Sequence, residues 1–207
     1  MNRRTRQLLT DALIAIVLST VLTIIFHVYG YNLSLVTLHL EWSIIPIIWF
    51  AFRQGPAATV MVGLIQGLIS GLIIWNTTTV EGVSLFMFLA LYQVLPYISL
   101  AVAGLFAKYT QKTLNNRRLS STYLNIVTGS ILAVLAFYLL CYGIIPYAFG
   151  EMSEFTVLTS RFWISVGIIS LVTIIILCML ARWKPQAIIP KRSQYLSRKE
   201  TSSLLND

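Results

Sequence analysis

Few side chains in the apolar part of this sequence could carry out chemistry. Asp11, His39, Glu41 and Arg161 are the ionisable residues that fall inside or beside apolar stretches. The sequence has no histidine and cysteine spacing typical of a metal site, no nucleophile elbow and no phosphate-binding glycine loop. It therefore predicts a protein that is not an enzyme, holds no metal or cofactor, and depends on partners for any ATP hydrolysis.

Aromatic residues with polar neighbours form a second group that could bind a ligand. Eight candidates for contact with a substrate are Tyr31, Glu41, Trp75, Tyr92, Gln93, Tyr138, Tyr142 and Trp163. A flat aromatic ligand needs stacking faces together with a few hydrogen-bonding groups. An interfacial belt, with rings in lipid and polar tips in water, uses the same residue types. The sequence leaves both interpretations open.

Glu41 has three possible roles. A carboxylate within an apolar stretch is costly to bury, so it usually faces the bundle interior, a partner group or a cavity. It could contact a ligand, pair with another side chain, or be solvated close to the membrane surface, and the sequence does not separate these roles.

The composition predicts that membrane helices position these residues. Of the 207 residues, 57% are hydrophobic and 11% are charged, whereas a soluble domain has about a quarter charged residues. A helix needs about 20 mainly apolar residues to cross a bilayer. Apolar runs of suitable length cover residues 8–28, 35–52, 56–75, 84–107, 121–145 and 161–181. We therefore expect an all-α bundle of six transmembrane helices over residues 1–182, followed by a polar, basic, solvated tail over residues 183–207.

The positions of the basic residues predict the orientation. Lys and Arg concentrate in cytoplasmic connections. With both termini cytoplasmic, that side receives every one of the 15 Lys and Arg residues except Arg161. The net charge of +8 is then explained by clusters that face an anionic leaflet, not by nucleic-acid binding. The expected location is the cell membrane, crossed several times.

Small residues mark one side of the first apolar run. Ala12, Ala15 and Ser19 lie within it, and the spacing of four between Ala15 and Ser19 puts these two on one helix face. Small residues allow two helices to approach closely. The face could pack within the bundle or receive another membrane subunit.

One segment resembles a known family. Glu41-Trp42-Ser43-Ile44-Ile45-Pro46-Ile47-Ile48, followed by Arg53-Gln54-Gly55, resembles the E-x-x-x-I-P-I and R-x-G pattern of the thiamine-specific substrate-binding components of energy-coupling factor transporters. Tyr29-Gly30-Tyr31 is similar to the external loop before that pattern, and residues 99–106 are similar to the end of the family's fourth helix.

The resemblance implies a membrane subunit that captures a vitamin from outside, below its external loops. Delivery would then require a transmembrane coupling subunit and two cytoplasmic ATPase subunits. In that family the small-residue face of the first helix meets the coupling subunit, so Ala12, Ala15 and Ser19 would carry this contact. Tyr31 would replace a loop aromatic, and Tyr92 with Gln93 would occupy the position of a Glu-Tyr pair.

The sequence departs from the family's pattern at three places. The acid of the Glu-Tyr pair is absent, the fifth helix lacks a histidine, and Gly167 stands at an asparagine position. Glu41, Glu81, Glu151 or Glu154 would have to supply a counter-charge for a thiazolium ring. The substrate could be thiamine, a related pyrimidine precursor or another B vitamin. Alternative functions are a self-sufficient secondary carrier and a non-transporting membrane interaction protein.

Overall fold

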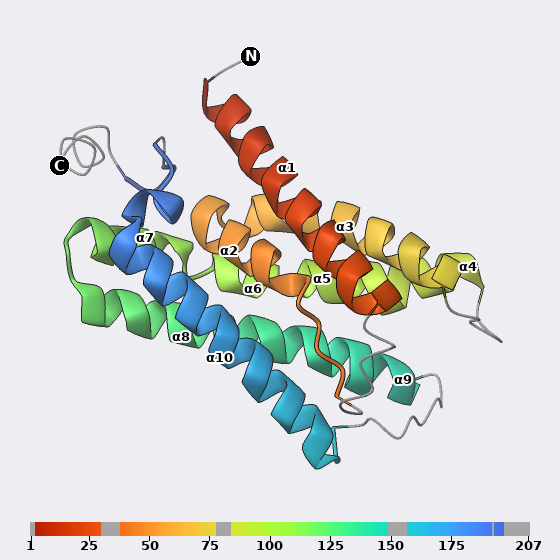
Figure 1. Ribbon diagram of the computed structural model, residues 1–207. Coiled ribbons are helices and arrows are strands. Elements are labelled where there is room, and N and C mark those ends of the chain that lie inside the picture. The colour runs from red at the N-terminus through yellow and green to blue at the C-terminus, as the bar shows by residue number, and fades with distance from the viewer. Residues whose placement is uncertain (1–2, 30–37, 78–83, 149–156, 192, 197–207) are drawn as a thin grey trace.

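Helices account for every regular element in the part of the chain that the structure describes (Figure 1). The structure is a computed structural model, and it describes residues 3–29, 38–77, 84–148, 157–191 and 193–196. The predicted all-α class is confirmed for these residues.

Five helices in the described ranges are long and apolar enough to cross a bilayer, with lengths of 22 to 31 residues. The first runs from Arg3 to Phe26 and combines α1 (Arg3–Thr23) with the start of a π-helical turn, η1 (Ile24–Tyr29), and the second is α3 (Pro56–Thr77). The third joins α4 (Leu85–Met87), η3 (Phe88–Val94), α5 (Leu95–Ser99), α6 (Ala101–Gly104) and α7 (Ala107–Asn115). The fourth joins α8 (Leu119–Leu139), η4 (Leu140–Ile144) and α9 (Ile145–Ala148), and the fifth is α10 (Ser160–Trp183). These five match five of the six predicted spans.

The remaining apolar run is not a full-length helix. We predicted a span over residues 35–52, but the helix found there is α2 (Ile44–Gln54), which has 11 residues. At 1.5 Å per residue it extends about 16 Å, about half of the hydrocarbon thickness. Residues 38–43 before it are not helical, and residues 35–37 lie outside the described ranges. A sixth spanning helix is therefore not confirmed.

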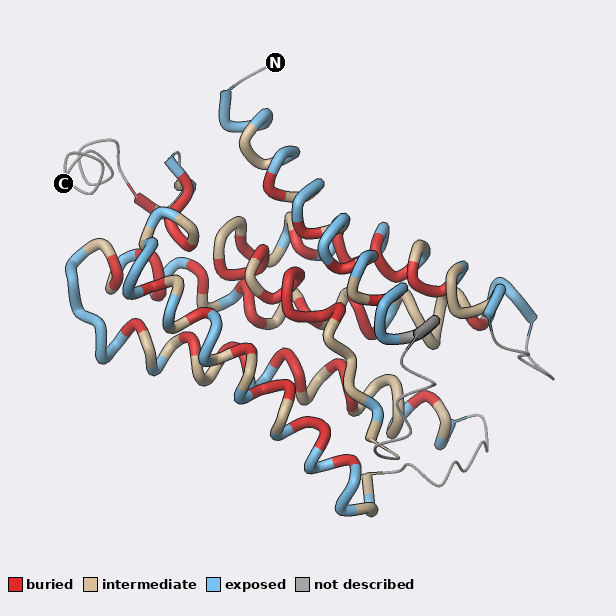
Figure 2. The backbone as a smooth tube through the Cα atoms, viewed as in Figure 1, coloured by how far each residue is buried: buried red, intermediate tan, exposed pale blue. Residues whose placement is uncertain are grey.

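The short helix α2 forms the centre of the bundle instead. Eight of its residues are buried, among them Phe50 and Phe52, which have no exposed surface. It contacts α1, α3, α6, α7, α8 and α10. Buried positions are concentrated on and around α2 in Figure 2, while the outer helices alternate between buried and exposed faces. An apolar run buried on all sides has the same composition as a membrane span, which explains why the sequence predicted a span here.

The outer helices present large apolar side chains to their surroundings. Leu13, Leu124 and Leu171 are more than half exposed, and many other Leu, Ile and Val residues are partly exposed. In water such a surface would be unfavourable, whereas lipid chains are as apolar as leucine. The outer surface is therefore suited to lipid.

The segment after α10 folds back onto the bundle. It contains a short 3₁₀ helix, η5 (Pro185–Ala187), and buries the side chains of Ile188, Ile189 and Leu196. We call residues 184–191 and 193–196 the C-terminal strap. The prediction of a solvated tail from residue 183 is wrong for the strap, since these three side chains are buried. The sequence did not indicate their burial because they are too few and too irregularly spaced to form a helical or strand pattern. Residues 197–207 lie outside the described ranges.

Candidate ligand-binding site

Successive helices run in opposite directions (Figure 1), so the described Lys and Arg residues lie at one end of the bundle, except Arg161 at the start of α10. We call one end, with Arg4, Arg53, Lys112, Arg118 and Arg182, the basic end. The other, the aromatic end, holds Trp75, Tyr92, Tyr138, Tyr142 and Trp163. Glu41 precedes α2 on the side of the aromatic end.

Glu41 is held there by two tyrosines from the fourth long helix. The Tyr142 hydroxyl donates a hydrogen bond to Glu41 Oε1 over 3.1 Å. The Glu41 backbone N–H donates to the Tyr138 hydroxyl over 3.1 Å, and this hydroxyl donates to the His39 carbonyl over 2.7 Å. Tyr138 and Tyr142 are four residues apart and so share a helix face. The structure therefore shows one of the three roles considered for Glu41, pairing with another side chain.

His39 joins this group, although we did not predict it as a site residue. Its ring centroid lies 5.3 Å from that of Tyr142, and its side chain is exposed. Residues 38–43 are not helical, and a backbone hydrogen bond from the Trp42 N–H to the Leu40 carbonyl makes a tight turn at Glu41. His39 was missed because the sequence predicted a helical span over these residues.

Three aromatic residues lie beside this group, around the third long helix. The Phe88 ring stacks on that of Tyr92 with centroids 6.2 Å apart, and Trp75 meets Phe88 at 5.5 Å. Cys141, next to Tyr142 in the chain, donates a weak hydrogen bond from its thiol to the Tyr92 carbonyl over 3.9 Å. The π-helical turn η4 therefore contacts both groups.

Gln93 lies against α3. A β-carbon added at Gly71 would come within 3.0 Å of Gln93 Cγ, so the glycine permits this close approach. Six of the eight predicted binding residues therefore lie at the aromatic end: Glu41, Trp75, Tyr92, Gln93, Tyr138 and Tyr142.

Trp163 lies apart from this group. It is 52% exposed, and its indole N–H donates to the Val157 carbonyl over 3.0 Å. The neighbouring Phe162 is buried instead and meets the Tyr138 ring edge-on at 6.0 Å. Tyr31, the remaining predicted residue, lies outside the described ranges. Phe162 was missed because a phenylalanine in an apolar run carries no signal of its own.

A comparison with protein families identifies the family of membrane protein to which the chain belongs. The family model described as thiamine transporter protein matches residues 9–189. The chain belongs to the thiamine transporter family. The match extends from α1 through α2 and all five long helices into the strap, so this family member is a membrane protein of thiamine transport.

The fold of this thiamine transporter family member is also found in a solved structure. It is similar to ThiT from Listeria monocytogenes with a TM-score of 0.65 and 21% sequence identity, covering 91% of this chain and 100% of that chain. At this identity the likeness concerns the fold. A comparison with curated proteins finds no match.

Among the described residues, one carboxylate is placed to supply the negative charge expected for a cationic ligand. Glu81, Glu151 and Glu154 lie outside the described ranges, and Asp11 lies at the basic end. Within the described part of the chain, Glu41 is therefore the single carboxylate at the aromatic end.

Gly167 does not face the binding residues. A β-carbon at this position would meet no atom within 4 Å, and the residue is exposed on the outside of α10. The buried face of α10 instead carries Ser165, Val166, Ile169 and Ser170. Gly167, which we placed at the family's asparagine position, therefore lies on the outer face of the helix.

The small residues of α1 face mainly inward. Ala15 and Ser19 have no exposed surface, and the Ser19 hydroxyl donates to the Ser43 carbonyl over 2.7 Å. Ala12 is partly buried. The face that carries Asp11, Ala15, Ser19 and Thr23 packs within this chain, so in this conformation Ala15 and Ser19 are not available to another subunit.

Proposed function

We propose that this protein is the substrate-binding subunit of an energy-coupling factor importer and that it binds thiamine at the aromatic end, beside Glu41. The family match supports thiamine as the substrate. The observation that carries the assignment of the site is the Glu41 carboxylate, which Tyr142 orients among aromatic rings. Thiamine combines a flat aminopyrimidine with a cationic thiazolium, so it needs both stacking surfaces and a counter-charge.

Each residue of the proposed site has a distinct role. The Glu41 carboxylate supplies negative charge in a poorly solvated place, where attraction to a cation is stronger than in water. Tyr142 fixes the direction of that carboxylate, and Tyr138 holds the backbone at Glu41 and His39. The rings of Tyr92, Phe88 and Trp75 offer stacking surfaces for the pyrimidine. Glu41 thus takes over the role of the acid that is absent from the Glu-Tyr pair.

The proposal includes an orientation and partners. The basic end is placed in the cytoplasm because Lys and Arg concentrate there, and the aromatic end then faces the outside. A transmembrane coupling subunit and two ATPase subunits would supply the energy, since the chain has no nucleotide-binding loop of its own. A contact between the coupling subunit and α1 would involve Ala12, which keeps some exposed surface, more than Ala15 or Ser19.

A test of the site compares thiamine with an uncharged analogue in which a neutral ring replaces the thiazolium. The purified protein should bind thiamine without ATP, and Glu41→Gln should weaken that binding by about 2 kcal/mol, or about 30-fold. The neutral analogue should lose little affinity in the same variant, because it makes no charge interaction. Equal losses for both ligands would show that Glu41 acts through structure alone, and no thiamine binding by the wild type would overturn the assignment.

A reconstitution experiment separates this function from secondary transport. Liposomes that contain only this chain should not accumulate thiamine under a proton or sodium gradient. Accumulation under such a gradient would instead identify a self-sufficient carrier.

A further inference from the structure

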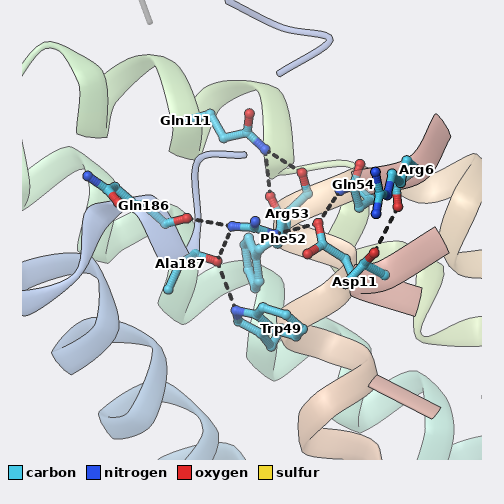
Figure 3. Close-up of polar contacts among 10 residues, drawn as sticks. Arg6, Asp11, Trp49, Phe52, Arg53, Gln54, Gln111, Gln186 and Ala187 are labelled. Carbon is cyan, nitrogen blue, oxygen red and sulfur yellow. Dashed lines mark hydrogen bonds and ion pairs between the residues drawn. The ribbon is translucent and has the colours of Figure 1, made fainter. Parts of the chain in front are cut away.

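Arg53, at the end of α2, connects α1 with the C-terminal strap at the basic end (Figure 3). Its Nε pairs with Asp11 Oδ2 of α1 at 2.7 Å. A terminal nitrogen of the same guanidinium donates to the carbonyl oxygens of Gln186 and Ala187 at 2.5 and 2.9 Å. The Arg53 and Asp11 side chains are only 11% and 8% exposed. A buried guanidinium needs several acceptors, and the strap supplies two of them.

The strap also completes the end of α2. The last four carbonyls of a helix have no partner inside the helix. Here Gln111 Nε2 donates to the carbonyls of Phe52 and Arg53 at 2.9 Å each, and Gln194 Nε2 of the strap donates to that of Gln54 at 2.9 Å. The Ser193 hydroxyl in turn donates to Gln111 Oε1 at 2.6 Å. The strap therefore satisfies α2 both directly and through Gln111.

Two further contacts fix the strap in place. The Trp49 indole N–H donates to the Ala187 carbonyl at 3.0 Å, while the Trp49 ring lies 5.7 Å from the Arg53 guanidinium (Figure 3). Gly55 has φ +85°, and a β-carbon there would overlap the Tyr195 hydroxyl. The strap thus lies directly over the turn between α2 and α3.

α1 is attached to both ends of α2. Asp11 meets Arg53 and Gln54 at the basic end, and Ser19 bonds to the Ser43 carbonyl at the other end of α2. Arg4 also donates directly to Gln194 Oε1 of the strap at 2.9 Å. A displacement of α1 at the basic end would therefore also displace the segment that carries Ser43.

This segment leads to the proposed ligand site. Ser43 is two residues from Glu41, and its hydroxyl shares a 2.7 Å hydrogen bond with the Tyr97 hydroxyl. The Tyr97 ring meets Phe137 edge-on at 5.3 Å, and Phe137 meets Tyr138, which bonds to the backbone at Glu41. Packed side chains and one rigid short helix thus connect the strap with the aromatic end.

We propose that the C-terminal strap is a latch that holds α1 against α2, and that its engagement is coupled through α2 to ligand occupancy at Glu41. The coupling part depends on the proposed function. Coupling between two sites is reciprocal, so bound thiamine stabilises the engaged strap. Displacing the strap loosens the site without any contact to the ligand.

The test uses the double variant Trp49→Phe/Ser193→Ala in the full chain. It removes the Trp49–Ala187 and Ser193–Gln111 hydrogen bonds but keeps the ring beside Arg53. The matched control is Trp183→Phe, because Trp183 is 68% exposed at the end of α10. Hydrogen exchange at residues 3–11 and 184–196 and the dissociation rate of thiamine are measured for each protein.

In the wild type we expect thiamine to slow exchange in the strap at least about 3-fold. In the double variant, exchange should rise in the strap and the start of α1, and thiamine should dissociate about 3- to 10-fold faster. The control should match the wild type.

Three results would overturn the inference. Faster strap exchange in the double variant with unchanged thiamine dissociation would refute the coupling. If strap exchange is unchanged in the double variant, a second variant truncated after Lys184 is measured. A hydrogen-exchange rate at residues 3–11 of the truncated protein equal to that of the wild type would refute the latch. A wild type that binds no thiamine would refute the proposed function and the coupling, while the exchange at residues 3–11 would still decide on the latch.

Discussion

The Tyr142 hydroxyl donates to the Glu41 carboxylate over 3.1 Å, across 101 positions of sequence. This bond joins the short segment before α2 to the π-helical turn η4. A hydrogen bond to a charged group contributes about 1.5–3 kcal/mol, and here it also sets the direction of the charge. Tyr142 should therefore matter for binding through Glu41 even without direct contact to the ligand.

Tyr142→Phe should weaken thiamine binding by about 1 kcal/mol, or about fivefold, because the ring is kept and only the hydroxyl is lost. Titration calorimetry measures the change. Tyr147→Phe is the matched control, since Tyr147 is 78% exposed on α9. Combined with Glu41→Gln, the Tyr142 variant should add almost nothing, because the two residues act as a pair. Additive losses would contradict this pairing.

Tyr138→Phe should act mainly on stability. The hydroxyl is buried, accepts from the Glu41 N–H and donates to the His39 carbonyl. Its removal leaves two backbone groups without this partner, at a cost of about 1–3 kcal/mol. Thermal unfolding in detergent should show a lower midpoint for Tyr138→Phe than for the wild type. A midpoint equal to the wild type would indicate that water replaces the hydroxyl.

Asp11→Asn should destabilise the protein by about 3 kcal/mol, because it leaves the buried Arg53 charge without its carboxylate. The two side chains are almost entirely buried, and the acceptors that the strap offers Arg53 are neutral backbone carbonyls. Denaturant unfolding in detergent gives the difference. Glu200→Gln removes the same charge elsewhere in the sequence and serves as the control. An equally small effect of both variants would show that the ion pair contributes little.

The long helices were predictable because apolar length is a local property of the chain, as α3 and α10 illustrate. Contacts between distant segments were not. The run at residues 44–52 has the composition of a membrane span, yet it is short and buried by six other helices. The strap depends on Ile188, Ile189 and Leu196, which show no period, and on backbone carbonyls that any sequence would offer.

The site shows the same division. Residue type alone indicated Glu41 and the tyrosines, since a carboxylate and polar rings are unusual in apolar runs. Which of them meet depends on packing. Phe162 contacts Tyr138 while Trp163 faces outward, although the two are adjacent and both aromatic.

The glycines provide a test of the packing around the site with an internal control. At Gly67 a β-carbon would come within 2.6 Å of Val94 Cα, and at Gly63 within 2.6 Å of the Tyr97 carbonyl oxygen. Both neighbours are backbone, which cannot rotate away. Gly67→Ala and Gly63→Ala should therefore cost about 1–3 kcal/mol. Gly167→Ala should be neutral or stabilising by up to about 1 kcal/mol, because the site is open and alanine favours helix.

The face of α1 can be tested in the same way, and the outcome distinguishes packing from docking. Ala15 has no exposed surface and faces α2, so Ala15→Leu should lower the unfolding midpoint and thiamine binding together. Ala12→Leu, at a partly buried position, should be milder in both assays. If Ala15→Leu instead abolished uptake by the assembled transporter while stability and thiamine affinity stayed at wild-type values, the residue would have to reach a partner. In that case α1 would leave α2 during transport, which would require the ion pair between Asp11 and Arg53 to open.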